Sequence, residues 1–437
     1  MRWKQSEYSG WGRVLRAEGR VARPERGAQL RAVAPLPALG NLRSYGDAAL
    51  VNAGDAIDMT RMDRLIAFDA ETGLLEAEAG ITIGEILRIF GPKGWMPTVI
   101  PGTGFATLGG CIANDVHGKN HHSAGSFGQH VESLTLIGID GKPRRISQKR
   151  EAKVFEATLG GLGQTGVIAA ARIQLVRCAG GEMSVSEKRM DDLDAFIDAF
   201  ERSNASYSVG WIDATARGSE AGRGILEEAE FNDDSPFAPA GKTRSIPFNA
   251  PSFAMNSLVV KAFNALYTRR IPVDGRTRDR NLADFFFPLD RIYDWNRLYG
   301  KKGFHQFQCV VPMEGAAEVL TDMLNRIGRS GAASPLAVLK KMGDGRIGPM
   351  SFPMEGMTLA VDFPNRAKAR DLIADLEDRA LAAGGRIYLA KDSLAQGRTI
   401  RTMYPDVEAF AEVANRVDPE RVFETDLVKR LGLRGTS

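Results

Sequence analysis

The chain has 437 residues, more than one hydrophobic core usually supports, so we expect two domains of ordinary soluble composition. Its 57 lysines and arginines nearly balance 54 aspartates and glutamates, and a net charge of +3 excludes nucleic acid as the main partner. The basic runs RTRDR and VKRLGLRG are short, and we expect solvated faces there, with a weak attraction to anionic membranes left open.

The cysteines and the N-terminal segment indicate the cellular compartment. Cys111, Cys178 and Cys309 lie far apart without a CxxC pair, which argues against a disulfide framework and a structural zinc site. The N-terminus lacks the apolar core of a secretory signal, and no window reaches ~18 uninterrupted apolar residues. We therefore expect a cytoplasmic protein, with peripheral contact at the inner membrane left open.

The first third of the chain reads as short strands broken by Gly, Asn and Asp turns. LIAFD and LLEAEAG alternate apolar and polar positions and predict paired strands around a turn at residues 71–73. Thr82 then predicts the N-cap of a short helix over IGEILRIFG.

Residues 101–128, PGTGFATLGGCIANDVHGKNHHSAGSFG, are unusually rich in glycine. Glycine lacks a Cβ and adopts positive φ freely, so its backbone N–H groups can approach a ligand closely. Ile112, Ala113 and Val116 between the glycines favour a packed interior over a surface loop. The stretch therefore predicts a cradle for a large anionic ligand.

Asp140-Gly141 predicts a hairpin turn, and a second glycine cluster, GGLGQTG, follows at residues 160–166. Its GxGxxG spacing matches a dinucleotide fingerprint, which requires a strand before the glycines and a helix after them. Here helix-like KVFEATLG precedes and strand-like VIAAARIQLV follows. We therefore expect no Rossmann domain and interpret these glycines as a turn close to the ligand.

The second half contains a strand, helix, strand pattern twice, over residues 304–342 and 356–393. Glycine follows each helix at the C′ position, and each unit is long enough for a crossover connection. The pattern predicts an α+β fold whose antiparallel sheet carries its helices on one face.

Strand alternation indicates which side chains share a face of that sheet. Gln306 and Gln308 lie on one face, and polar residues on the helix-free face indicate a ligand there. Thr358, Ala360 and Asp362 alternate in the same way. Lys340 and Lys391 fall near the ends of the two closing strands, where either a ligand contact or a solvated strand end is open.

Residues 215–290 look like the least regular region. Four prolines, 236, 239, 247 and 251, oppose long helices before the amphipathic, basic segment at about 255–270. A lid, a membrane contact and a helix packed on the domain body all remain open.

Four of the five histidines lie in or beside the glycine-rich stretch: His117, His121, His122 and His130, with His305 elsewhere. His117 and His121 have the spacing of a helical zinc pair, but Gly118 opposes a helix and no HExxH occurs. We expect no metal, and hydrogen bonds to an anionic cofactor or a substrate hydroxyl instead.

RSYGD, the stretch at 101–128 and GGLGQTG together resemble the FAD-binding domain of the vanillyl-alcohol-oxidase (PCMH-type) flavoproteins. HGKNHHSAGSFG, FHQFQ, VDFP, AKDS, MYP and VDPERVF resemble in particular the branch whose flavoprotein subunit oxidises decaprenylphosphoryl-β-D-ribose at the 2′ position. The resemblance implies a two-lobed FAD-binding domain over 1–180 and a substrate domain over 181–385, with an irregular lid region at about 215–290. Residues 386–437 would return to the FAD domain.

The resemblance implies FAD as cofactor, with its pyrophosphate against residues 40–46 and the backbone of residues 102–110. Tyr45 stands where relatives with covalently attached flavin carry histidine, so FAD should be non-covalent. The cofactor residues carried over are Gly40, Asn41, Arg43, Ser44, Tyr45, Gly46, Asp47, Pro101, Gly102, Thr103, Thr107, Gly109, Gly110, Cys111, Asn114, His117, Gly118, Asn120, His121, Ser123, Ala124, Gly125, Gly163, Gly166, Val167, Ile168 and Tyr404.

The same resemblance assigns the reaction centre. Lys391 would stabilise negative charge on the flavin after hydride transfer to N5, and His117 would be the base, with Tyr45 as the alternative. The substrate residues carried over are Lys119, Gln306, Gln308, Lys340, Thr358 and Ala360, of which Gln306, Gln308 and Lys340 would hold ribose and phosphate.

Two positions depart from the family pattern. Members sensitive to covalent nitroaromatic inhibitors carry cysteine where this chain has Ala360 and asparagine where it has Thr358. We expect the flavin chemistry to survive, no covalent adduct at position 360, and altered contacts to sugar hydroxyls.

The resemblance therefore predicts FAD-dependent oxidation of a secondary alcohol to a ketone, at the 2′-hydroxyl of a polyprenyl-phosphoryl-β-D-ribose. A short-chain reductase partner would complete epimerisation to arabinose for cell-wall polysaccharide. The alternatives are an aldonolactone or alditol oxidase that takes a soluble sugar, and a flavin-binding partner subunit without catalysis.

Overall fold

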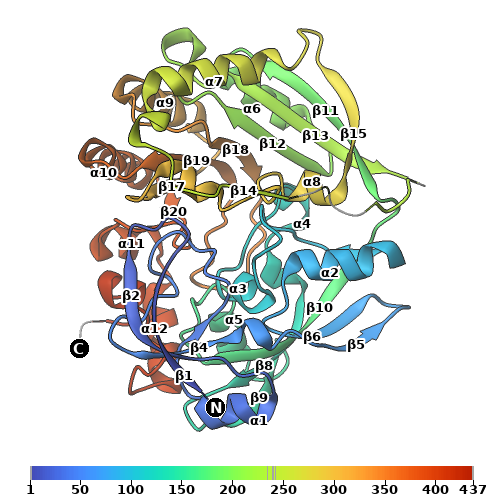
Figure 1. The fold of residues 1–437 in the computed structure, drawn as a ribbon, viewed down its shortest axis with the longest axis vertical. Coiled ribbons are helices and arrows are strands. Elements are labelled where there is room, and N and C mark those ends of the chain that lie inside the picture. Colours follow the sequence, from blue (N-terminus) through green and yellow to red (C-terminus); the bar gives the residue numbers. More distant parts are fainter. Residues whose placement is uncertain (1, 234, 239–240, 242, 436–437) are drawn as a thin grey trace.

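The computed structural model describes residues 2–233, 235–238, 241 and 243–435. Three main sheets and the helices around them form the α+β fold expected from the sequence (Figure 1). Strands β1 to β10 and the C-terminal helices occupy the lower part of the view, and an eight-stranded sheet occupies the upper part.

The first sheet is small and has the strand order β1-β2-β4-β3. β1 and β2 are antiparallel, whereas β4 pairs in parallel with both β2 and β3. Leu30 of α1 packs on Ile57 and Met59 under this sheet. The bounds are β1 (Trp3–Ser9), β2 (Arg16–Ala22), α1 (Gly27–Val33), β3 (Ala38–Leu39) and β4 (Asp55–Asp58).

The second sheet is antiparallel, with the order β5-β6-β10-β8-β9 and with β7 pairing β10. It confirms the strand pair around residues 71–73, the helix cap at Thr82 and the hairpin turn at Asp140-Gly141. Its strands are β5 (Leu65–Asp69), β6 (Leu74–Glu78), β7 (Trp95–Pro97), β8 (Val131–Ile137), β9 (Pro143–Ile146) and β10 (Val167–Arg177). Its helices are α2 (Ile83–Phe90), α3 (Leu108–Ala113), α4 (His121–Ala124) and α5 (Ala152–Thr158).

The glycines at 160–166 lie between α5 and β10, so a helix precedes them and a strand follows. This order confirms that the GxGxxG spacing does not mark a dinucleotide fingerprint of the Rossmann type.

The third sheet is antiparallel throughout, in the order β15-β11-β13-β12-β18-β19-β17-β20. Its first half comprises β11 (Glu182–Met190), β12 (Tyr207–Ile212), β13 (Gly224–Asn232) and β15 (Arg276–Asn281). Its second half comprises β17 (Phe304–Val311), β18 (Ala337–Met342), β19 (Gly356–Pro364) and β20 (Arg386–Ile387).

The two halves of this sheet repeat one topology. If the four strands of a half are numbered along the chain and read from the outer edge of the sheet inward, each half has the order fourth, first, third, second. This order is the split βαβ arrangement. The halves join edge to edge where β12 pairs with β18, with Gly210 opposite Leu339. The two strand, helix, strand units expected in the second half are confirmed, and the first half adds a related unit that the sequence pattern did not indicate.

The unit in the first half of the sheet was not predicted because residues 215–290 were expected to be irregular. The expectation is wrong for 224–232 and 276–281, which form β13 and β15 of the large sheet. The segment between them holds β14 (Arg244–Ser245) and α7 (Ser257–Arg269), and α8 (Leu282–Phe286) and β16 (Ile292–Tyr293) follow β15. Residues 234, 239–240 and 242 of the expected lid lie outside the described residues.

Three helices cover one face of the large sheet, as predicted, and over the first half α7 and α8 pack on the opposite face, with Tyr267 against Trp211 and Phe286 against Tyr207. α6 (Leu193–Arg202), α9 (Ala316–Ser330) and α10 (Ala367–Ala382) pack side by side, with α9 against β19 and α10 against β17. Their buried apolar residues, such as Phe196, Leu320 and Leu376, join the main core. β20 is only two residues long, so Lys391 lies in a turn beyond it rather than near the end of a strand.

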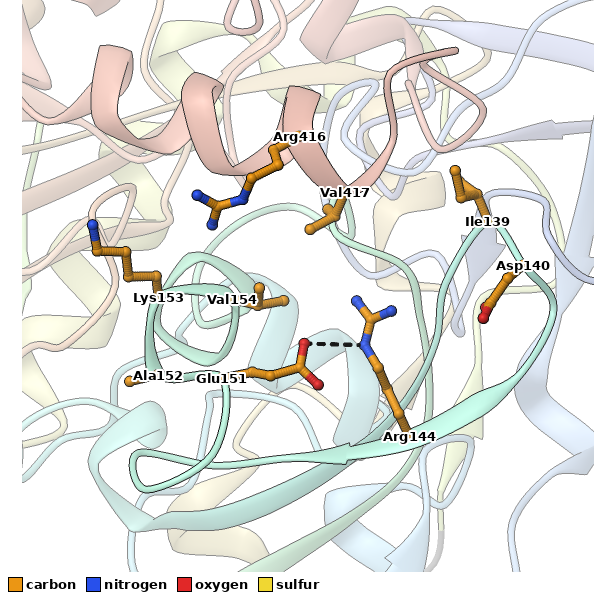
Figure 2. Close-up of a pocket in the computed structure, with 9 residues that line it drawn as sticks. All are labelled: Ile139, Asp140, Arg144, Glu151, Ala152, Lys153, Val154, Arg416 and Val417. Atoms are coloured by element: carbon orange, nitrogen blue, oxygen red, sulfur yellow. Dashed lines mark ion pairs between the residues drawn. The ribbon is translucent and has the colours of Figure 1, made fainter.

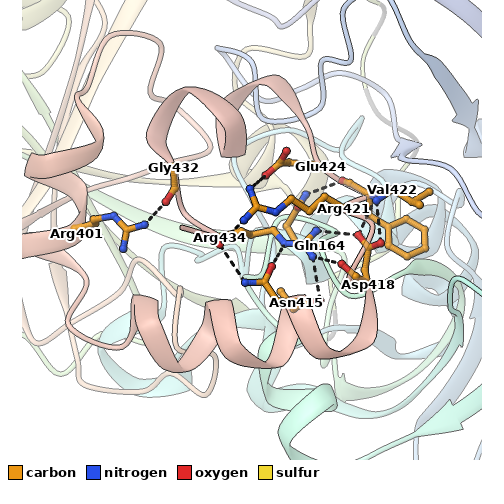
Figure 3. A network of polar contacts seen from close by, with 11 residues as sticks. Gln164, Arg401, Asn415, Asp418, Arg421, Val422, Glu424, Gly432 and Arg434 are labelled. Atoms are coloured by element: carbon orange, nitrogen blue, oxygen red, sulfur yellow. Dashed lines mark hydrogen bonds and ion pairs between the residues drawn. The ribbon is translucent and has the colours of Figure 1, made fainter. Parts of the chain in front are cut away.

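The C-terminal helices α11 (Gly397–Met403), α12 (Val407–Val417) and α13 (Asp426–Leu431) lie beside the first two sheets, with α12 against α5 (Figure 1). Arg434 is fully buried and pairs with Asp418 at 2.8 Å, in the polar network of Figure 3. Arg430 pairs with Asp47 and Asp392, each at 2.8 Å. The expectation that VKRLGLRG is a solvated face is therefore wrong.

Among the helices of the described ranges, none combines the length and the apolar character needed to cross a membrane.

Candidate active site

A cavity of about 650 Å³ lies between the loops that follow β3 and β7 and the face of the large sheet opposite α6, α9 and α10. Its volume falls within the roughly 300–1,000 Å³ typical of ligand sites. The glycine-rich loops line one end, and Gln306, Gln308 and Lys340 line the sheet side. The cavity thus brings together the residues expected to hold cofactor and substrate.

The cofactor end is built largely from backbone. Around Gly102 nothing lies within 4 Å of an ideal Cβ position, so its backbone faces open space. A Cβ at Gly40 would stand 2.4 Å from Thr107 Oγ1, so a side chain there would separate the two loops. Thr107 Oγ1 caps α3 by accepting a hydrogen bond from the Gly110 N–H at 3.2 Å. The two loops therefore pack closely together, and the backbone at Gly102 is left open to the phosphates of a dinucleotide.

Two polar atoms at this end test whether FAD fits. Arg43 Nε and Asn114 Oδ1 are buried and have no hydrogen-bond partner within the described part of the chain. Both residues line the cavity. Buried polar atoms are rarely left unsatisfied, so a polar ligand is expected here. A donor and an acceptor that line the same cavity as the glycine loops fit the phosphate and ribityl groups of FAD.

Most of the expected cofactor residues line this cavity: Gly40, Asn41, Arg43, Ser44, Tyr45, Pro101, Gly102, Thr103, Thr107, Gly109, Gly110, Cys111, Asn114, His117, Gly118, Gly163, Gly166 and Ile168. The others are not part of its wall: Gly46, Asp47, Asn120, His121, Ser123, Ala124, Gly125, Val167 and Tyr404. Several of these have structural partners instead. Tyr404 Oη donates to the Ile387 carbonyl at 2.6 Å, and His121 Nδ1 accepts from the Gly343 N–H at 3.2 Å.

His117 lies at the centre of the cavity wall. Its Nδ1 is 2.8 Å from Lys340 Nζ, and its Nε2 is 3.2 Å from Gln308 Nε2. Gln308 also donates to Thr358 Oγ1 at 3.2 Å. Burial, and then the positive charge of Lys340, hold the pKa of His117 well below its ordinary value. The imidazole is therefore neutral near pH 7 and can accept a proton.

Lys391 lies over the ring of Tyr45, with Nζ 3.6 Å from the ring centre. Burial lowers the pKa of Lys391 to about 8, although the carboxyl of Asp362 opposes the shift. Burial raises the pKa of Asp362 to about 7, and its oxygens accept hydrogen bonds from Gln306 and Tyr299. Near neutral pH this site therefore holds a weakly basic amine beside a weakly acidic carboxyl.

Two further lysines crowd the same cavity. Burial, and then the charges of Lys119 and Lys391, lower the pKa of Lys340 to about 7. Burial also lowers the pKa of Lys119 to about 8, where its Nζ donates to the Phe285 carbonyl at 2.6 Å. A positive charge on one lysine makes its neighbour harder to protonate. An anionic ligand would therefore stabilise the protonated forms of Lys119, Lys340 and Lys391.

The far end of the cavity was not predicted. Arg270, Arg278, Arg280 and Glu227 line it. The expectation that RTRDR is a solvated face is wrong for Arg280, whose side chain is only 15% exposed and pairs with Glu227 at 2.9 Å, whereas residues 277–279 are exposed. Alternation along a strand would have placed Arg276, Arg278 and Arg280 on one face, had the segment been identified as β15. The same alternation along Thr358, Ala360 and Asp362 places Asp362 on the sheet face that lines the cavity.

A second hollow of about 640 Å³ lies between the β8–β9 hairpin, α5 and the end of α12 (Figure 2). Exposed Lys153 and Arg416 lie on its rim, and Arg144 pairs with Glu151 at 3.3 Å. None of the expected site residues line it, so it does not compete with the first cavity as the active site.

Comparison with known proteins agrees with this geometry. Residues 30–147 match the family model described as an FAD binding domain, and residues 358–431 match that of D-arabinono-1,4-lactone oxidase. Decaprenylphosphoryl-β-D-ribose oxidase of Mycolicibacterium smegmatis is 36% identical over 409 residues, covering 90% of this chain and 88% of its own.

Two further relatives extend the comparison. An uncharacterized protein of Streptomyces coelicolor, encoded in the mprA 5′ region, is 32% identical over 372 residues, covering 81% of this chain and all of its own. L-gulono-1,4-lactone dehydrogenase of Mycobacterium tuberculosis is 22% identical over 446 residues, covering 97% of this chain and 98% of its own. FAD is therefore the cofactor, and the chain belongs to the FAD-binding oxidoreductase family that includes decaprenylphosphoryl-β-D-ribose oxidase.

Proposed function

We propose that the protein oxidises the 2′-hydroxyl of a polyprenyl-phosphoryl-β-D-ribose to the ketone. One observation carries the proposal: a buried neutral imidazole, His117, lies between Lys340 and Gln308 in the cavity that the glycine loops open into. The cavity therefore offers a proton acceptor and groups that bind hydroxyls beside the cofactor cradle. The relative named for decaprenylphosphoryl-β-D-ribose supports this substrate.

Bound FAD supplies the two-electron acceptor for hydride from the carbinol carbon. Lys391 presents positive charge to the same cavity from its position over the Tyr45 ring, 3.6 Å from the ring centre. A fixed cation in a dry cavity stabilises negative charge far better than one in water. We assign that electrostatic role to Lys391.

His117 accepts the proton of the substrate hydroxyl in this proposal. Its low pKa makes it a weak base, but Lys340 Nζ lies 2.8 Å away and has a pKa of about 7. A proton taken by the imidazole can therefore pass to the Lys340 amine near neutral pH. Burial raises the pKa of Tyr45 well above its usual value, so Tyr45 stays protonated and donates a hydrogen bond rather than acting as base.

Gln306, Gln308 and Lys340 hold the sugar and the phosphate oxygen nearest to it, and Lys119 closes the other side. Thr358 already receives a hydrogen bond from Gln308 at 3.2 Å, so it shapes the pocket through that amide. Ala360 lies opposite Gln308 in the sheet and has no thiol to attack a nitroaromatic compound. Intact-mass measurement after incubation with such an inhibitor should show no adduct at position 360.

A second candidate is oxidation of a soluble aldonolactone or alditol. It is favoured by the match of residues 358–431 to D-arabinono-1,4-lactone oxidase. Anaerobic mixing of the holoenzyme with each substrate class separates the two, because the true substrate bleaches the flavin absorbance. Bleaching by lactones but not by lipid-linked ribose would contradict our proposal. A flavin-binding subunit without catalysis would respond to neither and would still bind a reductase.

We also propose two partners for this reaction. A short-chain reductase would complete the epimerisation to arabinose. A membrane surface would deliver the substrate to α7, where Leu258 and Leu266 are 76% and 69% exposed. Exposed apolar residues on a helix with a basic end are typical of interfacial helices.

A further inference from the structure

We infer that Arg270, Arg278 and Arg280 form the subsite for the phosphodiester anion of a lipid-linked sugar, with its isoprenoid chain leaving over α7. The inference rests on the proposed function and assigns a role to the end of the cavity farthest from the glycine loops.

Charge imbalance is the first observation. Buried Glu187 contacts Arg270 at 3.1 Å, Arg276 at 2.6 Å and Arg278 at 2.9 Å. Glu227 contacts Arg280 at 2.9 Å and Arg270 at 3.8 Å. Four guanidinium groups therefore share two carboxylates.

Both signs of charge persist in this cluster. Burial raises the pKa of Glu187, but its arginine neighbours outweigh burial, so its pKa is lowered and the carboxylate stays ionised. Arginine does not lose its proton in proteins. Two positive charges are thus left over in a partly buried cluster, and an anion would compensate them.

Unused donors are the second observation. Arg270 Nε is buried and has no hydrogen-bond partner in the described part of the chain. A guanidinium carries five N–H groups in a planar fork that matches two oxygens of a phosphate. Arg270, Arg278 and Arg280 all line the cavity, so one anion can lie within reach of all three positive charges, with Arg270 Nε as its unused donor.

Lys119 connects this cluster to the reaction centre. The charges of Glu227 and Arg280 shift the pKa of Lys119, and the charge of Lys119 in turn shifts that of Lys340. The cations therefore form a series from Lys391 to Arg280 along one cavity. A sugar held by Gln306 and Gln308 would place its phosphate one group farther along that series, with its outer oxygens toward the arginines.

Aromatic rings mark a path from the arginines to the surface. Tyr267 of α7 lines the cavity, with its ring 4.7 Å from that of Trp211 and 5.7 Å from that of Phe263. Phe263 is 46% exposed, on the same helix as Leu258 and Leu266. An isoprenoid chain attached to the phosphate would bury apolar surface along this row.

The test compares Arg280→Gln with Arg326→Gln in the FAD-loaded protein. Arg326 lies on α9 and also pairs with a carboxylate, that of Asp322 at 3.0 Å, but it neither lines the cavity nor belongs to the arginine cluster. For Arg280→Gln we expect the KM for polyprenyl-phosphoryl ribose and the Kd for farnesyl phosphate to rise about 10- to 100-fold. Arg326→Gln should change neither.

Two more variants separate binding from structure. Arg280→Lys keeps the charge but not the fork, so its loss should be intermediate. Glu227→Gln removes a competing carboxylate, so farnesyl phosphate should bind more tightly than to the wild type, an effect that a folding defect cannot produce. FAD content and melting temperature report folding in every variant.

Each outcome decides one point. Equal farnesyl phosphate affinity in Arg280→Gln and wild type would overturn the subsite. Inorganic phosphate binding as tightly as farnesyl phosphate would overturn the lipid assignment in favour of a free-phosphate site. If lipid-linked ribose bleaches no flavin but Arg280→Gln still weakens farnesyl phosphate, the subsite stands and the proposed reaction fails.

Discussion

Two groups of arginines in this molecule have opposite surroundings. At the C-terminus, Arg434 is completely buried and bonds to Asp418, to the Asn415 side chain and to two backbone carbonyls (Figure 3). In the cavity, Arg270 and its neighbours outnumber their carboxylates, and Arg270 Nε has no partner among the described residues. The first group is saturated by the protein itself, and the second is not. Counting acceptors around each guanidinium thus separates a structural clamp from a binding site.

Among the predicted changes, we expect the largest effect from Arg434→Met, which removes the central guanidinium of the saturated group. Removing one partner of a buried ion pair leaves the other uncompensated, so the free energy of unfolding should fall by about 3–5 kcal/mol. Urea unfolding measures this loss. The double variant Arg434→Met/Asp418→Leu should recover part of it, and a single variant as stable as the wild type would contradict the structural assignment.

Lys391→Met should show the reverse behaviour, with little loss of stability and a large loss of rate. Without the cation over Tyr45, turnover should fall by about 100- to 1,000-fold, while FAD stays bound. Single-turnover flavin bleaching measures the rate, and absorbance after gel filtration measures FAD content. Unchanged turnover would remove Lys391 from the reaction.

A change of pH can test the C-terminal arginines through Glu377, which lies close enough to Asp392 and Arg430 to sense their charges. Burial, and then Asp392, raise its pKa from 4.5 to about 8. Between these values the folded state holds a proton that the unfolded state has released. Stability should therefore fall as pH rises from about 4.5 to 8, by at most about 1.4 kcal/mol per pH unit from this group.

Glu377→Gln removes that titration. Its free energy of unfolding, measured by urea at several pH values, should lose this decline and exceed the wild-type value increasingly towards pH 8. A parallel pH profile in variant and wild type would show that the carboxyl is not held protonated.

The smallest effect is expected on the apolar face of α7. Leu258→Ser/Leu266→Ser should reduce sedimentation with anionic vesicles several-fold, because both side chains are exposed on that helix. Ile66→Ser is the matched control, since Ile66 is 53% exposed on β5, far from α7 (Figure 1). Equal loss in both variants would exclude α7 as the membrane contact.

Local signals in the sequence were enough for much of the fold. Thr82 acts through its hydroxyl on the Glu85 N–H three residues away, and Asp140-Gly141 through its own backbone, so the cap and the hairpin were predictable. The alternation of side chains along a strand is also a local property, and it placed Gln306 and Gln308 on the face of the sheet opposite α9 and α10. The glycines at 101–128 predicted a cradle because the absence of a Cβ, which permits close packing at Gly104 and Gly109, is a property of each residue alone.

Long-range pairing was not predictable. Arg430 meets Asp47 across 383 positions, and Arg280 meets Glu227 across 53. No local pattern indicates such partners, so both basic runs looked solvated. β13 and β15 were not predicted for a related reason. Both strands flank β11 in the sheet, but α7 and a proline-rich segment separate them in the sequence.

The most direct measurement of the central claim uses polyprenyl-phosphoryl ribose carrying deuterium at C2′. If the 2′ carbon gives up its hydride in the step that bleaches the flavin, the labelled substrate should bleach it several-fold more slowly than the unlabelled one. Equal rates for both substrates, or slowing only by a label at another ribose carbon, would contradict oxidation at the 2′ position.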